Sequence, residues 1–196
     1  MIIHDISKDT LTTPVYTGDP ETKIETLASM ENGDSYNLSA IHISAHTGTH
    51  IDAPKHFSEE GKAIDEMRLN TFTGKCTVIS ADRILTGEDM DELLPRCKRR
   101  ILIHGEGNAY LSASAARVIA DSKVVLVGID ASSIAAEYEV ALTHRILCDA
   151  GVAILENLDL SDISDGEYEI CAFPIKLGGL EAAPCRAILL EQERGI

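Results

Sequence analysis

Short aliphatic runs recur along the chain and alternate with stretches of helical composition. The run at 123–129, Lys-Val-Val-Leu-Val-Gly-Ile, is apolar after its first residue, which is typical of a strand buried on both faces. Residues 152–155 repeat this pattern. Further strands are predicted at 2–6, 76–80, 100–103, 168–172 and 186–191. Strands interleaved with helices indicate a mixed α/β fold, and the length of 196 residues predicts one domain covering 1–196.

Three helices are predicted between these strands. The first, at 88–94, must end before Pro95, which cannot continue a helix. The second, at 112–120, begins with a serine, a favoured capping residue. The third, at 137–150, is followed by a glycine, which suits the left-handed conformation found just past helix ends.

The third helix directs a histidine toward the core. Val140, His144 and Leu147 recur at positions that share one helix face, so the imidazole lies on an apolar stripe. A buried imidazole needs a partner. The periodicity alone leaves open whether His144 is a hydrogen-bonded core residue or a metal ligand.

Apolar and polar residues alternate over 41–46, which predicts a half-buried strand with one polar face. His46 ends this strand on the polar face. Gly48 follows, and glycine permits a backbone turn that most residues resist. Such a turn can swing His50 back toward His46.

The chain after this turn is expected to be extended. Pro54 disfavours a regular helix there, so Asp52 and His56 can project the same way from an extended piece. The segment therefore differs from the His-Glu-x-x-His pattern, whose two ligands depend on an unbroken helix.

Residues 46–56 concentrate side chains that bind divalent metals. The stretch holds three imidazoles and one carboxylate, in a chain with only seven histidines. These groups suit metals such as zinc or manganese, and a catalytic site also needs a nearby group that carries protons. A single histidine near a strand end is usually solvated or hydrogen-bonded, but this density favours a metal site.

Two carboxylates follow predicted buried strands. Glu156 comes after four apolar residues, where an unpaired charge is costly to bury. A metal ion would offset that cost, and so would a salt bridge to Arg145 or Arg186. Asp130 ends the run at 123–129, where it can cap the next turn or hydrogen-bond to a metal ligand and orient it.

Composition disfavours several classes of partner. The net charge of −15, from 17 basic and 32 acidic residues, argues against nucleic acid and membrane surfaces. Five scattered cysteines without a Cys-x-x-Cys pair are typical of reduced thiols. The start of the chain lacks a signal-peptide pattern, and no apolar run approaches the ~20 residues of a membrane helix. We expect a cytoplasmic protein that acts on a small molecule.

The segment His46-Thr-Gly-Thr-His50-Ile-Asp52-Ala-Pro-Lys-His56 resembles the H-x-G-T-H-x-D-x-P-x-H signature of the cyclase-type metal-dependent hydrolases. That family includes bacterial kynurenine formamidases and isatin hydrolases. Other segments resemble the family in the expected order, at 14–20, 127–133, 144–157 and 176–187. The chain departs from the family pattern at Thr17, where proline is usual, and at Glu181-Ala182, where Asp-Gly is common.

This resemblance implies the swivelling β/β/α fold, with a mixed, partly barrel-like sheet. It also implies a homodimer or homotetramer, in which a neighbouring subunit can contribute to the pocket. Tyr16 would line the substrate pocket. Phe57, His42 and His104 are further pocket candidates, and His104 is expected to be structural or to lie at the pocket rim.

The resemblance further implies a centre for two divalent metal ions, with zinc favoured and manganese as the alternative. One ion would be held by His46, His50 and Asp52. The other would be held by Asp52, His144 and Glu156, so that the two carboxylates bridge the ions. His56 would carry a proton rather than bind metal.

The expected activity is arylformamidase-like hydrolysis of a small amide, lactam or ester. Bound metal ions would make hydroxide available at neutral pH and stabilise the oxyanion, with His56 as general acid and base. Such an enzyme is a metal-dependent amidohydrolase acting on C–N bonds other than peptide bonds. Two alternatives stay open: a metal-dependent cyclase, dehydratase or lyase, and a non-catalytic binding module stabilised by metal. The substrate itself is left undefined.

Overall fold

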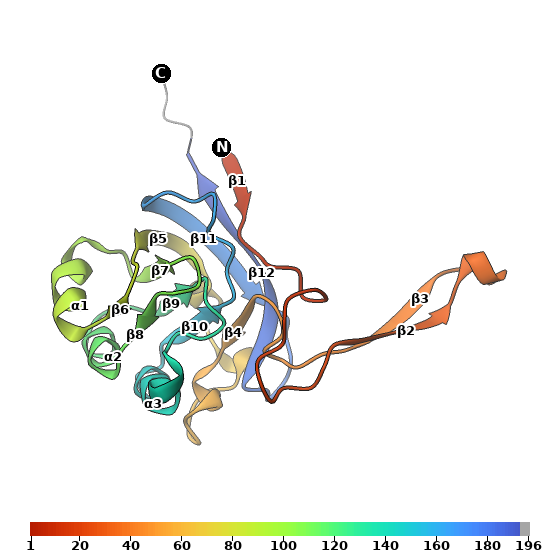
Figure 1. Cartoon of the computed structure of the whole chain (residues 1–196), viewed down its shortest axis with the longest axis horizontal. Coiled ribbons are helices and arrows are strands. Elements are labelled where there is room, and N and C mark those ends of the chain that lie inside the picture. The colour runs from red at the N-terminus through yellow and green to blue at the C-terminus, as the bar shows by residue number, and fades with distance from the viewer. Residues whose placement is uncertain (193–196) are drawn as a thin grey trace.

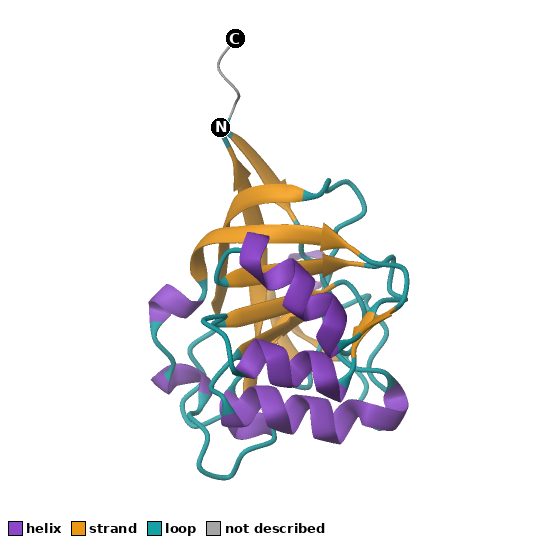
Figure 2. Cartoon of the chain, turned by 90° about the vertical axis from the view of Figure 1, so that its left-hand side faces the viewer, coloured by secondary structure: helices purple, strands orange, loops and turns teal. Residues whose placement is uncertain are grey.

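A mixed β-sheet that curls into a barrel forms the body of the protein, and helices cover one side of it (Figures 1 and 2). The computed structural model describes residues 1–192. The strands follow in the order β1 (Ile2–Asp5), β12 (Ala182–Glu191), β11 (Gly166–Pro174), β5 (Thr73–Ser80), β7 (Arg100–His104), β9 (Leu126–Ile129), β10 (Ala153–Glu156) and β4 (His50–Asp52). Pairing of β4 with β12 closes the barrel and leaves β1 outside the ring.

Strand direction divides the sheet into two parts. β5, β7, β9 and β10 run parallel to one another, whereas β1, β11, β12 and β4 lie antiparallel to their neighbours. Parallel neighbours need long crossover connections, and the helices lie in these connections. The predicted mixed α/β fold with a partly barrel-like sheet is therefore confirmed.

Two hydrophobic layers hold the sheet, because successive side chains of a strand point to opposite faces. Ile101 and Ile103 of β7 pack in the layer beneath the helices, whereas Leu102 between them packs inside the barrel. In β10, Ile154 faces the helices and Leu155 faces the barrel interior. Burial on both faces explains the unbroken aliphatic runs of the sequence.

The helices are α1 (Gly87–Leu93), α2 (Ala113–Ala120) and α3 (Val140–Asp149). Figure 2 shows them on one side of the sheet. Thr86 and Ser112 cap α1 and α2, and each hydroxyl accepts a backbone N–H from the first turn. The predicted helix at 137–150 is shorter at its start than expected, since Glu137–Glu139 forms a 3₁₀ turn.

The remaining elements are short. Within residues 1–192, 3₁₀ turns occur at Met30–Asn32, Pro54–His56, Ile64–Glu66, Leu69–Thr71, Leu94–Arg96 and Glu137–Glu139. A small parallel pair joins β6 (Ile84–Leu85) to β8 (Tyr110–Leu111). None of the helices in this part of the chain combines the length and the apolar character needed to cross a bilayer.

A two-stranded hairpin projects from the barrel as an arm, residues 23–42 (Figure 1). It pairs β2 (Lys23–Ala28) with β3 (Leu38–His42) in antiparallel fashion. The predicted half-buried strand at 41–46 is wrong in extent and in burial, because β3 ends at His42 and Ile41 is 54% exposed. Alternation of apolar and polar residues indicates an extended strand. Burial of its apolar face also needs a neighbouring element, which residues 1–192 of one chain do not supply.

Candidate metal centre

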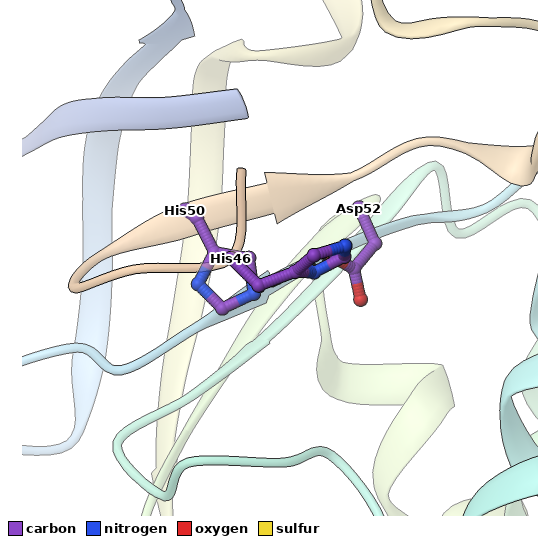
Figure 3. A group of neighbouring side chains, drawn as sticks. All are labelled: His46, His50 and Asp52. Carbon is purple, nitrogen blue, oxygen red and sulfur yellow. Dashed lines mark ion pairs between the residues drawn. The ribbon is translucent and has the colours of Figure 1, made fainter. Parts of the chain in front are cut away.

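Three side chains of the His-rich segment gather on one side of β4 (Figure 3). His50 and Asp52 lie two residues apart in β4 and so share a face of the strand, while His46 comes from the turn before it. His46 Nδ1 lies 2.9 Å from Asp52 Oδ1, and His50 Nε2 lies 3.4 Å from the same oxygen. The three groups are close enough to bind one cation together.

Gly48 makes this convergence possible. Its φ is +67°, a left-handed conformation that glycine adopts without strain, and an added Cβ would lie 2.7 Å from Thr10 Cα. The Gly48 carbonyl oxygen accepts a hydrogen bond from His50 Nδ1 at 2.8 Å. The rings of His46 and His50 lie 5.1 Å apart, so the turn brings His50 back toward His46 as predicted.

A second group joins the first through Asp52. His144 comes from α3 and Glu156 from the end of β10. His144 Nε2 lies 3.3 Å from Glu156 Oε1 and 3.9 Å from Asp52 Oδ2. Glu156 Oε2 also lies 3.5 Å from His50 Nε2. The structure thus brings the predicted ligands together as two groups that share one aspartate.

The negative charge of Glu156 is paired with imidazoles of this cluster rather than with an arginine. Arg186 pairs with Asp5 instead. Within residues 1–192, the ion pairs of Glu156 are with two histidines, and Arg145 is not among its partners. Of the two explanations that the sequence left open for this buried carboxylate, the arginine salt bridge is therefore wrong.

Several atoms of the centre are buried without a hydrogen-bond partner. These are both carboxylate oxygens of Asp52 and Nε2 of His50. His50 and His144 each present Nδ1 to a backbone carbonyl oxygen at 2.8 Å. In the neutral ring the proton then lies on Nδ1, and the Nε2 lone pair faces the carboxylates. Acceptors that face one another need a cation between them, so this set of donor atoms fits a divalent metal ion.

The electrostatics of the centre call for added positive charge. Burial would raise the pKa of Asp52, yet the imidazoles of His46 and His50 hold it well below its usual range. Burial would lower the pKa of His50, yet Asp52 and Glu156 raise it to about 10. The buried carboxylates therefore stay ionised, and protons on the imidazoles or metal ions must balance them.

His56 lies beside both groups and belongs to neither of them. It ends the 3₁₀ turn Pro54–His56, so the predicted extended piece is wrong here; proline is well suited to the first position of a helical turn. The His56 ring lies 4.3 Å from that of His46 and 6.0 Å from that of His144. Burial lowers the pKa of His56, which leaves a neutral imidazole that can accept a proton near pH 7.

A cavity of about 220 Å³ opens onto the centre. Tyr16 and Phe57 line it, together with His56 and the imidazoles of both groups. His42 does not, because it lies on the arm. Two of the pocket candidates from the sequence are therefore in place, and His42 is not.

His104 and Asp130 belong to a neighbouring loop. His104 lines a different hollow, with Nε2 4.0 Å from Asp130 Oδ2. The Asp130 carboxylate accepts hydrogen bonds from the backbone N–H groups of Gly105 and Gly107 at 3.0 and 3.2 Å. Asp130 thus stabilises the loop after β7, rather than its own turn or a metal ligand.

The cavity wall includes polar residues that sequence reasoning missed, among them Asp19, Ser132 and Asn157. Asn157 has φ +57°, a left-handed conformation that asparagine tolerates better than most residues. Its position directly after Glu156 was a usable signal. Asp19 and Ser132 reach the cavity through the course of their loops, for which the local sequence gave no sign.

The chain is similar to known proteins in sequence and in fold. The sequence model of a family described as putative cyclase matches residues 2–136. A kynurenine formamidase from Delftia acidovorans is 34% identical over 190 residues, 90% of each chain. A solved structure described as a potential metal-dependent hydrolase with cyclase activity is 32% identical, with a TM-score of 0.81 over 98% of both chains. Isatin hydrolase A from Labrenzia aggregata, 19% identical, shares the fold, with a TM-score of 0.82 over 97% of this chain and 94% of its own.

The barrel, the helices on one side and the two imidazole–carboxylate groups are together those of a metal-dependent hydrolase. The chain belongs to the cyclase family, as its match to the family model and its 34% identical relative show.

Replacing Gly48 by Ala should destabilise the protein and weaken metal binding, because the new side chain strains a left-handed residue and clashes with Thr10. We expect the free energy of unfolding to fall by about 1–3 kcal/mol, and dialysed protein to retain less divalent metal. Urea denaturation and metal analysis measure the two effects. Gly151→Ala is the control, since Gly151 has φ +75° but open space around it. Equal metal loss in both variants would contradict a special role for Gly48.

Proposed function

We propose that this protein is an arylformamidase-like hydrolase that uses two divalent ions, zinc in preference to manganese, to cleave a small amide, lactam or ester. The observation that carries the proposal is the pair of imidazole–carboxylate groups sharing Asp52 at the wall of a cavity. The 34% sequence identity to a kynurenine formamidase supports cleavage of C–N bonds other than peptide bonds. The cavity of about 220 Å³ lies below the roughly 300–1,000 Å³ of pockets for drug-sized ligands, which favours a small substrate.

The residues of the chain divide the work between them. His46, His50, Asp52, His144 and Glu156 would hold the metal ions. Bound divalent ions lower the pKa of water and polarise a carbonyl oxygen, which favours attack on the carbonyl carbon. The backbone carbonyl groups that fix Nδ1 of His50 and His144 keep both rings oriented without reorganisation.

His56 would move the proton. As a neutral imidazole on the cavity wall, it is placed to take a proton from the attacking water and deliver it to the leaving nitrogen or oxygen. Tyr16 and Phe57 would form the aromatic part of the substrate pocket. Both rings face the same cavity as His56, which would hold the scissile bond near the proton carrier.

A metal-dependent cyclase, dehydratase or lyase is the second candidate. It is supported by the cyclase activity named for a 32% identical structure. A purely structural metal site is disfavoured, because structural zinc sites are closed by four protein ligands, whereas this centre faces a cavity.

Purified protein should contain about two equivalents of zinc or manganese per chain and should hydrolyse one or more compounds in a panel of formamides, N-formylkynurenine, isatin and simple lactones. Removal of the metal by a chelator should abolish turnover, and added zinc should restore it. In ¹⁸O-labelled water the product of hydrolysis carries the label, whereas a cyclase or lyase product does not. An unlabelled product would reject hydrolysis.

Replacing His56 by Ala should lower turnover by about 10²–10⁴-fold, the usual contribution of a general acid–base group, while metal content stays unchanged. Steady-state kinetics and metal analysis of the same sample test this. His4→Ala is the control, since His4 pairs with Glu191 outside the cavity. Loss of metal from the His56 variant would make His56 a ligand instead of a proton carrier.

We also propose that the chain assembles as a homodimer or homotetramer through its arm. Ile24 and Ile41 lie directly opposite each other in the hairpin and are 57% and 54% exposed. A two-stranded hairpin is marginally stable alone, so these apolar side chains favour a covering partner. A second copy of the chain satisfies this need, because each copy can then cover the arm of the other.

The double variant Ile24→Glu with Ile41→Glu should convert the assembly to a monomer, because it places two charges in the proposed contact. Light scattering coupled to size-exclusion chromatography gives the mass. The exposed Glu25→Lys change in the same hairpin serves as the control and should leave the mass as it is. A wild-type protein that elutes with the mass of one chain would refute the assembly.

A further inference from the structure

We propose that Glu181 is a positioning residue of the metal centre, which orients His46 by accepting a hydrogen bond from its outer ring nitrogen. The inference rests on the metal centre proposed above. Glu181 directly precedes β12, far from His46 in the sequence.

The ring of His46 lies between two carboxylates. Its Nδ1 faces the interior of the centre, 2.9 Å from Asp52 Oδ1. Its Nε2 faces outward, 3.5 Å from Glu181 Oε1. A proton on Nε2 leaves the Nδ1 lone pair free for a cation, and the outer carboxylate holds the ring in that tautomer.

The other two imidazoles of the centre show why His46 needs such a partner. His50 and His144 each bond a backbone carbonyl oxygen through the nitrogen that faces away from the carboxylates. For His46, the partner recorded at this nitrogen within residues 1–192 is Glu181. His46 is also held by fewer surroundings than the other two imidazoles, since it lies in a turn outside the sheet and its side chain is 18% exposed, against 2% and 3% for the others.

The backbone fixes Glu181 at this place. The Ala53 N–H donates to the Glu181 carbonyl oxygen at 2.8 Å, and the β4–β12 register sets Ala182 opposite Asp52. Closure of the barrel therefore determines which side chain just before β12 reaches His46. The separation of 3.5 Å is that of an ion pair and exceeds the roughly 2.7–3.2 Å of an N–H···O hydrogen bond, so the proposed bond requires the partly exposed Glu181 side chain to move toward His46.

The test compares zinc affinity in Glu181→Ala, Glu181→Gln and the wild type, by competition with a chromophoric chelator. Loss of a carboxylate that orients a ligand histidine costs about 10–100-fold in metal affinity, so Glu181→Ala should bind zinc at least tenfold more weakly. Glu181→Gln keeps an acceptor oxygen and should recover part of that affinity. The visible spectrum of the cobalt-substituted protein should change with Glu181→Ala, because the ligand geometry changes.

Two further measurements separate positioning from other effects. Glu59→Ala removes an equally negative, exposed side chain that follows the His-rich segment, and it should leave zinc affinity and the cobalt spectrum as in the wild type. The melting temperature of the metal-free protein should be the same in all variants, since Glu181 acts through the bound state.

Wild-type zinc affinity in both Glu181 variants would overturn the inference, and so would an equal loss in Glu59→Ala, which would show a general effect of surface charge. If Glu181→Ala does not fold, Glu181→Gln decides alone, and wild-type affinity in that variant rejects the role. A wild-type protein that binds no zinc, manganese or cobalt would instead reject the metal centre itself.

Discussion

The structure depends on the burial of two carboxylates at one place. Glu156 and Asp52 come from adjacent strands, β10 and β4, and their negative charges repel each other. Burial and the charge of Asp52 would raise the pKa of Glu156, but the nearby imidazoles of His144 and His50 outweigh both and lower it. A pair of ionised groups in this position is tolerated only with cations around it. The imidazoles and the proposed metal ions supply that charge.

Pairing of β4 within the barrel brings distant residues to the His-rich segment and so completes the metal centre. β4 is only His50–Asp52, yet it pairs with β10 on one side and β12 on the other. Glu156 comes from the end of β10, and Glu181 comes from the residue directly before β12. A strand bonded on both edges has little freedom, so the side chains of β4 are held in place before any ligand arrives.

The sequence predicted the parts of this centre that local rules govern. Helical periodicity placed His144 on an inward face, and the apolar run before Glu156 marked it as a costly buried charge. The exposure of Ile41 was not predictable, because alternation does not say whether another chain covers an apolar face. Nor was the contact of Glu181 with His46, which depends on the pairing of strands distant along the chain. Long-range register is the information that local patterns lack.

The environment divides the imidazoles of the centre into two kinds. Those of His50 and His144 lie against carboxylates, which raise their pKa values despite burial. Burial lowers the pKa of His56, whose ring instead lies beside that of His46. Groups whose surroundings push their pKa values apart take different roles in catalysis. One eleven-residue segment can therefore supply both metal ligands and a neutral proton acceptor, because His56 lies in the 3₁₀ turn that follows β4 and belongs to neither ligand group.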